Sequence, residues 1–195
     1  MNFLAHVFLS GNDPDLLFGN YIGDFVKGNQ HEQLPEAIQN GVLLHREIDT
    51  YTDNHPIVSQ SKDRLRDKYR HYAGVIVDLY YDHYLASLWE QYHTTSLKQF
   101  TENAYRVVNE RREHLPTRAE RTYLYMSRDN WMYHYREITG IERALTGMAH
   151  RTRFNSRMDE AGGELRQHYD LFRQDFQAFI PDVRSFANQW IAANR

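Results

Sequence analysis

The sequence of 195 residues contains no cysteine. Disulfides and thiolate metal sites are therefore excluded, and this composition fits a reducing compartment. No stretch approaches the roughly 20 apolar residues that a membrane-spanning helix needs. The first residues, MNFLAHVFLSGNDPD, lack the basic start and the long apolar segment of a secretory signal. We therefore expect a soluble, cytoplasmic protein with no membrane partner.

Glycine and proline are also scarce, with 10 and 5 residues, and no repeat, low-complexity segment or long linker divides the chain. Alternating strand patterns with hairpin turns are absent. We therefore expect a single all-α domain over residues 1–195. The net charge of −3 argues against a general nucleic-acid binder.

Apolar periodicity and the positions of proline and asparagine predict where the helices lie. Asp13-Pro14 is typical of a helix start, with an N-cap followed by proline in the first turn. Pro181 is expected to interrupt the chain before a short terminal helix. The other expected helices cover residues 14–26, 35–52, 57–70, 72–92, 96–113, 117–133, 141–150 and 155–180.

The most informative stretch is residues 74–89, GVIVDLYYDHYLASLW. Its apolar residues occur on every side, which predicts a helix buried over most of its circumference. Asp78 and Asp82 stand four residues apart and therefore share one face, where two carboxylates repel each other. Either a metal ion or an arginine from a neighbouring helix must lie between them, and the adjacent His83 favours a metal ion.

A second informative stretch is residues 43–56, LLHREIDTYTDNHP. His45, Asp49 and Asp53 follow at intervals of four, and His55 lies in the turn. A histidine and a carboxylate at this spacing can hold one cation or hydrogen-bond each other, so the pair alone fits a structural role as well as a catalytic one. Arg46 fits either a phosphate ligand or an ion-pair partner of a nearby aspartate.

A third group lies near the start of the chain. His6 interrupts the apolar run NFLAHVFLS, and Asn20 and Asp24 share a face of the next predicted helix. Titratable groups thus interrupt apolar helices in three separate segments, and their convergence would mark a functional site. Nitrogen and oxygen donors without sulfur suit Mn²⁺, Fe²⁺, Mg²⁺ or Zn²⁺, and the chemistry they suggest is hydrolysis. No nucleophile elbow, phosphate-binding loop or dinucleotide fingerprint is present.

Four segments carry a family resemblance: MNFLAHVFLS, GNYIGDFVKG, GVLLHREIDTYTDNHP and YYDHYLASLW. With them the chain resembles the acyl carrier protein phosphodiesterases, divergent relatives of the HD-domain metal-dependent phosphohydrolases. The likeness continues to the DFxxFxP pattern of residues 175–181. HD enzymes usually carry a sequential His-Asp pair, whereas this chain has the reverse order, Asp82-His83.

The resemblance implies an HD-like helical bundle with a divalent metal, Mn²⁺ favoured, between its helices. It implies hydrolysis of the phosphodiester that joins 4′-phosphopantetheine to a serine of holo-acyl carrier protein, a reaction of fatty acid biosynthesis. The expected groups for catalysis are Arg46, His55 and His83. The expected metal ligands are His6, Asp24, His45, Asp49, Asp78, Asp82 and His83.

The expected partner, holo-acyl carrier protein, is small and acidic, so a basic rim should lie beside the site. Arg64, Arg66, Lys68 and Arg70 directly precede the predicted metal-bearing helix and are the expected rim. One rival interpretation is another HD-type phosphohydrolase acting on a nucleotide or other small phosphodiester. A second is a non-catalytic helical binding module. The sequence fixes neither the number of ions nor the oligomeric state.

Overall fold

The computed structural model describes residues 1–194, and this part of the chain is helical with no β-strand. The predicted all-α class is confirmed. The α-helices are α1 (Phe3–Leu9), α2 (Pro14–Ile22), α3 (Glu36–Asn54), α4 (Pro56–Tyr69), α5 (Ala73–Ser87), α6 (Leu97–Glu110), α7 (Thr117–Arg128), α8 (Trp131–His134), α9 (Ile138–Arg151), α10 (Gly162–Gln167) and α11 (Tyr169–Ala193). Short 3₁₀ helices are η1 (Gly23–Phe25), η2 (Gly28–Gln33), η3 (Arg70–Tyr72), η4 (Trp89–Gln91), η5 (Arg112–His114) and η6 (Met158–Glu160).

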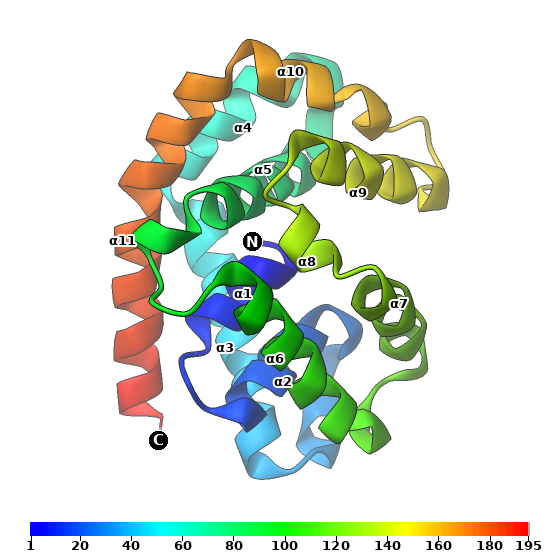
Figure 1. Cartoon of the computed structure of the whole chain (residues 1–195), viewed down its shortest axis with the longest axis vertical. Helices are drawn as coiled ribbons and strands as arrows, with labels where there is room; N and C mark the ends of the chain where they lie inside the picture. Colours follow the sequence, from blue (N-terminus) through cyan, green and yellow to red (C-terminus); the bar gives the residue numbers. More distant parts are fainter. Residues whose placement is uncertain (195) are drawn as a thin grey trace.

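The long helix α11 runs along one edge of the molecule and packs against α3, α4 and α5 (Figure 1). Aromatic rings fill the interface between α5 and α11, where Tyr80 meets Phe172 edge to face and Tyr81 meets Phe176 in the same way. All four rings are fully buried. Large aromatic side chains contribute much of the buried apolar area of such a core. This packing fixes α5, the helix on which Asp78 and Asp82 lie.

Helices α2 and α3 approach each other closely because glycines face each other between them. A Cβ atom on Gly19 would lie 2.2 Å from the carbonyl oxygen of Ile38, and one on Gly41 would lie 2.5 Å from that of Leu16. Only a residue without a side chain fits at such a contact. The close approach brings the carboxyl end of α2 beside the middle of α3, where His45 and Asp49 lie.

Several predicted helix boundaries are wrong. The predicted helix 72–92 ends at Ser87, and 117–133 breaks at Asn130, whose φ of 41° is left-handed and whose side chain caps α8. The predicted helix 155–180 comprises η6, α10 and the start of α11. Pro181 interrupts nothing, because it lies within the continuous α11, where packing against three helices compensates for the missing backbone donor.

The helix α1 was not predicted, although its apolar run and His6 were noted. Its buried residues include Leu4, Val7 and Leu9. Figure 1 shows it in the interior of the molecule, beneath α6, so that the start of the chain lies among the other helices. Within the described residues, none of the helices has the length and apolar character needed to cross a membrane.

Candidate metal centre

His6 on α1 is held by a buried amide. The amide nitrogen of Asn20 donates to the backbone oxygen of His6 (2.9 Å) and to Ser10 Oγ (3.0 Å), so the Asn20 Oδ1 atom is an acceptor. That oxygen lies 2.7 Å from His6 Nδ1, which must therefore carry the proton. The Nε2 atom of a neutral His6 is then an acceptor, and it lies 3.1 Å from Asp49 Oδ1.

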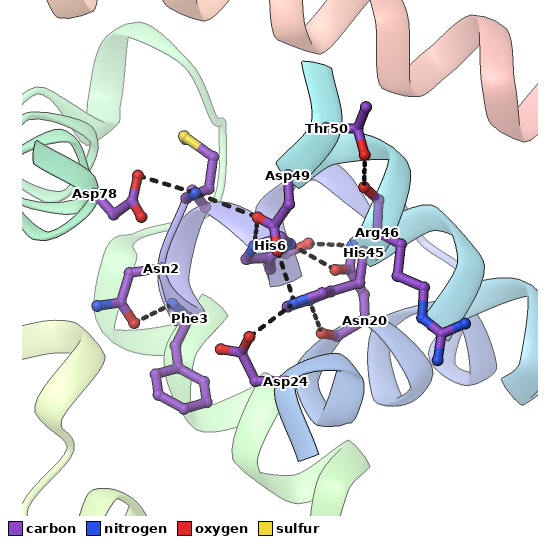
Figure 2. Close-up of polar contacts among 12 residues, drawn as sticks. Asn2, Phe3, His6, Asn20, Asp24, His45, Arg46, Asp49, Thr50 and Asp78 are labelled. Atoms are coloured by element: carbon purple, nitrogen blue, oxygen red, sulfur yellow. Dashed lines mark hydrogen bonds and ion pairs between the residues drawn. The ribbon is translucent and has the colours of Figure 1, made fainter. Parts of the chain in front are cut away.

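His45 on α3 is oriented in the same way by a backbone group. Its Nδ1 atom lies 2.8 Å from the carbonyl oxygen of Asn20 and must donate to it. Its Nε2 atom faces two carboxylates, Asp49 Oδ2 at 3.2 Å and Asp24 Oδ1 at 3.3 Å. Figure 2 shows both rings and the Asp49 carboxylate converging from α1 and α3.

His6, His45 and Asp49 therefore present acceptor atoms to one another. One ligand atom from each lies within 4.8 Å of the others. Lone pairs facing each other at such distances need either a proton or a cation between them. Two imidazole nitrogens and a carboxylate, with each imidazole donating its other N–H to an oxygen, form a common arrangement for binding a divalent metal. The residues present thus fit such an ion.

The charges of the cluster are strongly coupled. Burial and the neighbouring His45 lower the pKa of His6 to about 4. Burial also opposes a charge on His45, but hydrogen bonds with Asp24 and Asp49 raise its pKa to about 9. Against the effect of burial, hydrogen bonds with His45 and His6 hold the pKa of Asp49 well below its usual range. Without a metal, one proton on His45 therefore balances part of the carboxylate charge.

A cavity of about 240 Å³ opens beside the cluster. No lysine or arginine among the described residues lines it, and its only cationic group is the buried amino group of Met1. That group lies 3.1 Å from Asp78 Oδ1 and 3.4 Å from Asp49 Oδ1, so the position between these carboxylates already accommodates a cation (Figure 2). The acidic lining residues are Asp24, Asp49, Asp53 and Asp78.

The pKa values of Asp78 and Asp24 shift in opposite directions. Burial raises the pKa of Asp78, although the Met1 amino group opposes this shift. The hydrogen bond with His45 lowers the pKa of Asp24, which lies in η1 because α2 ends one turn earlier than predicted. At this cavity the carboxyl group of Asp78 therefore holds a proton more readily than that of Asp24.

Asp82 is fully buried and faces the start of α1 instead of the cavity. Its two carboxylate oxygens accept the backbone N–H groups of Leu4 (2.8 Å) and Ala5 (3.1 Å), which a helix leaves unpaired in its first turn. Burial raises the pKa of Asp82 to about 7 in spite of these bonds. Asp82 thus anchors α1, and with it His6.

Three predicted catalytic residues lie outside this cluster. Arg46 points away from it in Figure 2 and donates to the carbonyl oxygens of Val26 (3.1 Å) and Gly28 (2.7 Å). His83 Nε2 lies 2.9 Å from the hydroxyl of Tyr169, on α11. His55 packs edge to face on an aromatic ring of α11 and, within residues 1–194, has no hydrogen-bond partner for its buried Nδ1 atom.

The sequence comparisons identify the family of the chain. The family model described as acyl carrier protein phosphodiesterase matches residues 1–183. The chain belongs to this family. Among relatives named acyl carrier protein phosphodiesterase, the protein of Enterobacter sp. is 34% identical over 93% of this chain and 94% of its own length. The corresponding protein of Photorhabdus laumondii is 32% identical over 93% and 92%. One from Escherichia coli O45:K1 is 32% identical over 97% and 98%. No solved structure matches the chain.

In this member of the acyl carrier protein phosphodiesterase family, three of the four residues predicted as a basic rim pair with acidic side chains of the protein itself. Arg64 forms an ion pair with the buried Asp175 of α11, and Lys68 lies 2.7 Å from Glu164 of α10. Arg66 pairs with Asp63 at 3.0 Å on its own helix. Arg66 and Arg70, with Lys62 and His71, line a cavity of about 500 Å³ that shares Asp53 with the cavity beside the candidate metal centre.

Two contributors to the centre of this phosphodiesterase were not predicted as site residues. Asn20 orients both imidazoles. The feature of the sequence that could have revealed this role is its amide side chain within the apolar segment FGNYIGDFV. Gly23 leaves room for a ring, since a Cβ atom there would lie 2.2 Å from His45 Cγ. The sequence around Gly23 does not show its contact with His45, because this contact joins η1 to α3.

Proposed function

We propose that this protein is a metal-dependent phosphodiesterase that hydrolyses holo-acyl carrier protein to apo-acyl carrier protein and free 4′-phosphopantetheine. Membership of the acyl carrier protein phosphodiesterase family supports the reaction class and the substrate. The observation that supports a metal is the convergence of the acceptor atoms of His6, His45 and Asp49. An HD-like arrangement of the helices stays a prediction.

His6, His45 and Asp49 would hold the ion, with Asp24 and Asp78 at the edge of the cavity. This donor set fits Mn²⁺, which the family resemblance favours, and also Fe²⁺, Zn²⁺ or Mg²⁺. Such an ion makes water a nucleophile near neutral pH and offsets the negative charge of a phosphodiester. Because no lysine or arginine of residues 1–194 lines the cavity, this charge has to be met by the ion and the Met1 amino group.

The aspartates at the cavity would move the protons. Asp24, which is ionised and borders the cavity, is the group placed to accept a proton from the attacking water. Asp78, whose pKa burial raises, is suited to protonate the serine oxygen that leaves from phosphorus. Arg46, His55 and His83, the residues predicted for these tasks, do not line the cavity, so they would support the helices instead.

The test is the mass of the carrier protein. Holo-acyl carrier protein incubated with the enzyme and Mn²⁺ should lose the phosphopantetheine moiety, and EDTA should prevent this loss. Asp49→Asn should abolish the reaction, whereas Asp63→Asn, an exposed aspartate on α4, should leave it intact.

Two other outcomes would reject the proposal in different ways. An unchanged carrier mass with metal verified in the enzyme would contradict the carrier-protein reaction and favour a small phosphodiester as substrate. An unchanged mass with no bound metal would contradict the metal centre itself and favour a non-catalytic helical binding module.

A further inference from the structure

A second basic surface lies between α7 and α9, apart from the predicted rim on α4. Residues of these helices and of α8 line a groove of about 580 Å³ that has no acidic residue in its wall. Figure 1 shows α8 joining α7 to α9 on this side of the molecule. We name this surface the arginine groove. Its principal residues are Arg118, Arg121, Tyr125, Trp131 and Arg151.

The three arginines of the groove have few contacts with the rest of the protein. Within residues 1–194 none of their guanidinium groups pairs with a carboxylate, and only Arg151 has a side-chain hydrogen bond, to the carbonyl oxygen of Gly147 (3.0 Å). The nearby acidic groups are already engaged, Glu120 by Arg112 and Asp129 by Arg128. The positive charge of the groove is therefore not neutralised by the protein itself.

Apolar and aromatic side chains accompany this charge. Leu124 and Tyr125 of α7 are 48% and 47% exposed, although the opposite face of the same helix is buried in the core. Trp131 borders the groove from the start of α8. Tyrosine, tryptophan and arginine are the residues most enriched where proteins bind each other tightly. The groove therefore has the composition of a protein-binding surface.

Helix α9 contributes residues both to the groove and to the cavity beside the candidate metal centre. Met148 lines the cavity of the metal centre, and Arg151, one helical turn further, lines the groove. A partner seated in the groove would thus contact the last turn of the helix that also borders the cavity. Its charge must be negative to complement three unpaired arginines.

We infer that the arginine groove is the docking surface for an acidic helical protein, whose modified side chain then enters the neighbouring metal centre. This inference rests on the proposed function for the identity of that partner as an acyl carrier protein. It assigns recognition to α7 and α9, not to the α4 residues, most of which pair with acidic side chains of this protein.

The experiment compares two double variants of equal charge. Arg118→Gln with Arg121→Gln removes two groove arginines. Arg106→Gln with Arg166→Gln removes two exposed arginines on α6 and α10 as the matched control. Binding of fluorescent apo-acyl carrier protein is measured by anisotropy at low and high salt, together with hydrolysis of bis(4-nitrophenyl) phosphate, which needs no docking surface.

The groove variant should bind the carrier about 10-fold or more weakly and with less salt dependence, because rim charges act mainly through long-range attraction. Its hydrolysis of the small diester should equal that of the wild type, which also shows that the variant is folded. An equal loss of carrier binding in the control, or an unchanged Kd in the groove variant, overturns the inference.

A Glu-rich amphipathic helical peptide separates this inference from the proposed function. If the wild type binds the peptide through the groove but neither binds nor hydrolyses the carrier, the docking surface stands and the proposed substrate fails. If the wild type hydrolyses the carrier and the groove variant has an unchanged KM, the proposed function stands and the docking surface fails. Binding of neither probe overturns the docking surface.

Discussion

The imidazole rings of His6 and His45 stack with their centroids 3.9 Å apart and their planes inclined by 18°. Two charged imidazoles at this distance would repel each other strongly. The pair therefore carries a single positive charge when no metal is bound, and the hydrogen bonds of Asp24 and Asp49 place the additional proton on Nε2 of His45. A metal ion would replace this proton, so binding should release it to solvent.

The first prediction concerns stability without metal. The pKa of His45 in the folded state, about 9, exceeds its ordinary value of 6.5, so the folded protein binds more protons between these two values. The stabilisation is complete below pH 6.5, and the free energy of unfolding falls as the pH rises through 9. At 1.36 kcal/mol per pKa unit the contribution is at most about 3 kcal/mol. Urea unfolding in EDTA at pH 7 and pH 9 measures this loss.

The His45→Gln variant is the control for that measurement. It keeps a polar side chain of similar length but cannot titrate, so its stability should fall less between pH 7 and pH 9. Some loss should remain in the variant, because Asp78 and Asp49 raise the pKa of the Met1 amino group to about 10 against the effect of burial. Identical pH dependence in both proteins would mean that His45 is neutral in the metal-free state.

The second prediction concerns Asn20. Asn20→Ala removes the acceptor that orients His6, so that the buried Nδ1–H group of His6 loses its partner, and it removes the two hydrogen bonds that Asn20 donates to the His6 carbonyl oxygen and to Ser10. We expect a loss of about 1–3 kcal/mol in stability and a Mn²⁺ affinity weaker by about 10- to 100-fold. Isothermal titration measures the second effect. Asn40→Ala, which removes only a surface hydrogen bond to Asn194, should change neither quantity appreciably.

The third prediction separates an anchoring aspartate from a metal ligand. Asp82→Asn keeps one side-chain oxygen that can accept and replaces the other by an NH₂ group. This NH₂ group would face one of the two backbone N–H groups of α1, which then lacks an acceptor. The substitution should cost about 1–3 kcal/mol of stability while the bound metal remains one equivalent per site. Asp49→Asn should instead lose the metal, because Asp49 belongs to the cluster of acceptor atoms. Loss of metal from a fully folded Asp82→Asn protein would contradict this separation of anchoring from metal binding.

The fourth prediction uses two glycines. The Cβ of Gly23→Ala would overlap the His45 ring, so the ring must move and Mn²⁺ affinity should fall by about 10-fold or more. Gly147→Ala on α9 meets nothing within 4 Å and should stabilise the helix by about 0.5–1 kcal/mol with unchanged affinity. Thermal unfolding and metal titration of both variants check the pair. Equal Mn²⁺ affinities of the two variants would show that η1 can shift away from α3 and leave the His45 ring in place.

The sequence predicted the helical class and indicated segments whose polar side chains converge, because polar residues in apolar helices are visible without a structure. His6, His45 and Asp49 do meet at one place. Spacing could not distinguish Asp78, which faces the cavity, from Asp82, which caps a helix one turn away. The direction of a side chain depends on the neighbour that packs against it, and α1, which binds Asp82, was not predicted as a helix.

The same limitation explains the other differences. Arg46 and His55 lie in the most specific motif of the chain, yet they contact η2 and α11, respectively, instead of the cluster. The sequence shows that such residues are unusual, but it does not show which part of the protein they contact. Asn20 illustrates the converse, since an uncharged residue in an apolar helix orients both histidines.

The anchoring of α1 by Asp82 has a consequence for how the protein folds. With seven residues, α1 is shorter than the roughly 12–15 residues at which an isolated helix becomes even marginally stable in water. The first three helices contain His6, His45 and Asp49, but His6 is in place only once α5 has docked and Asp82 holds the start of α1. During synthesis, therefore, the nascent chain should acquire its metal-binding capacity only after the segment that contains Asp82 has left the ribosome.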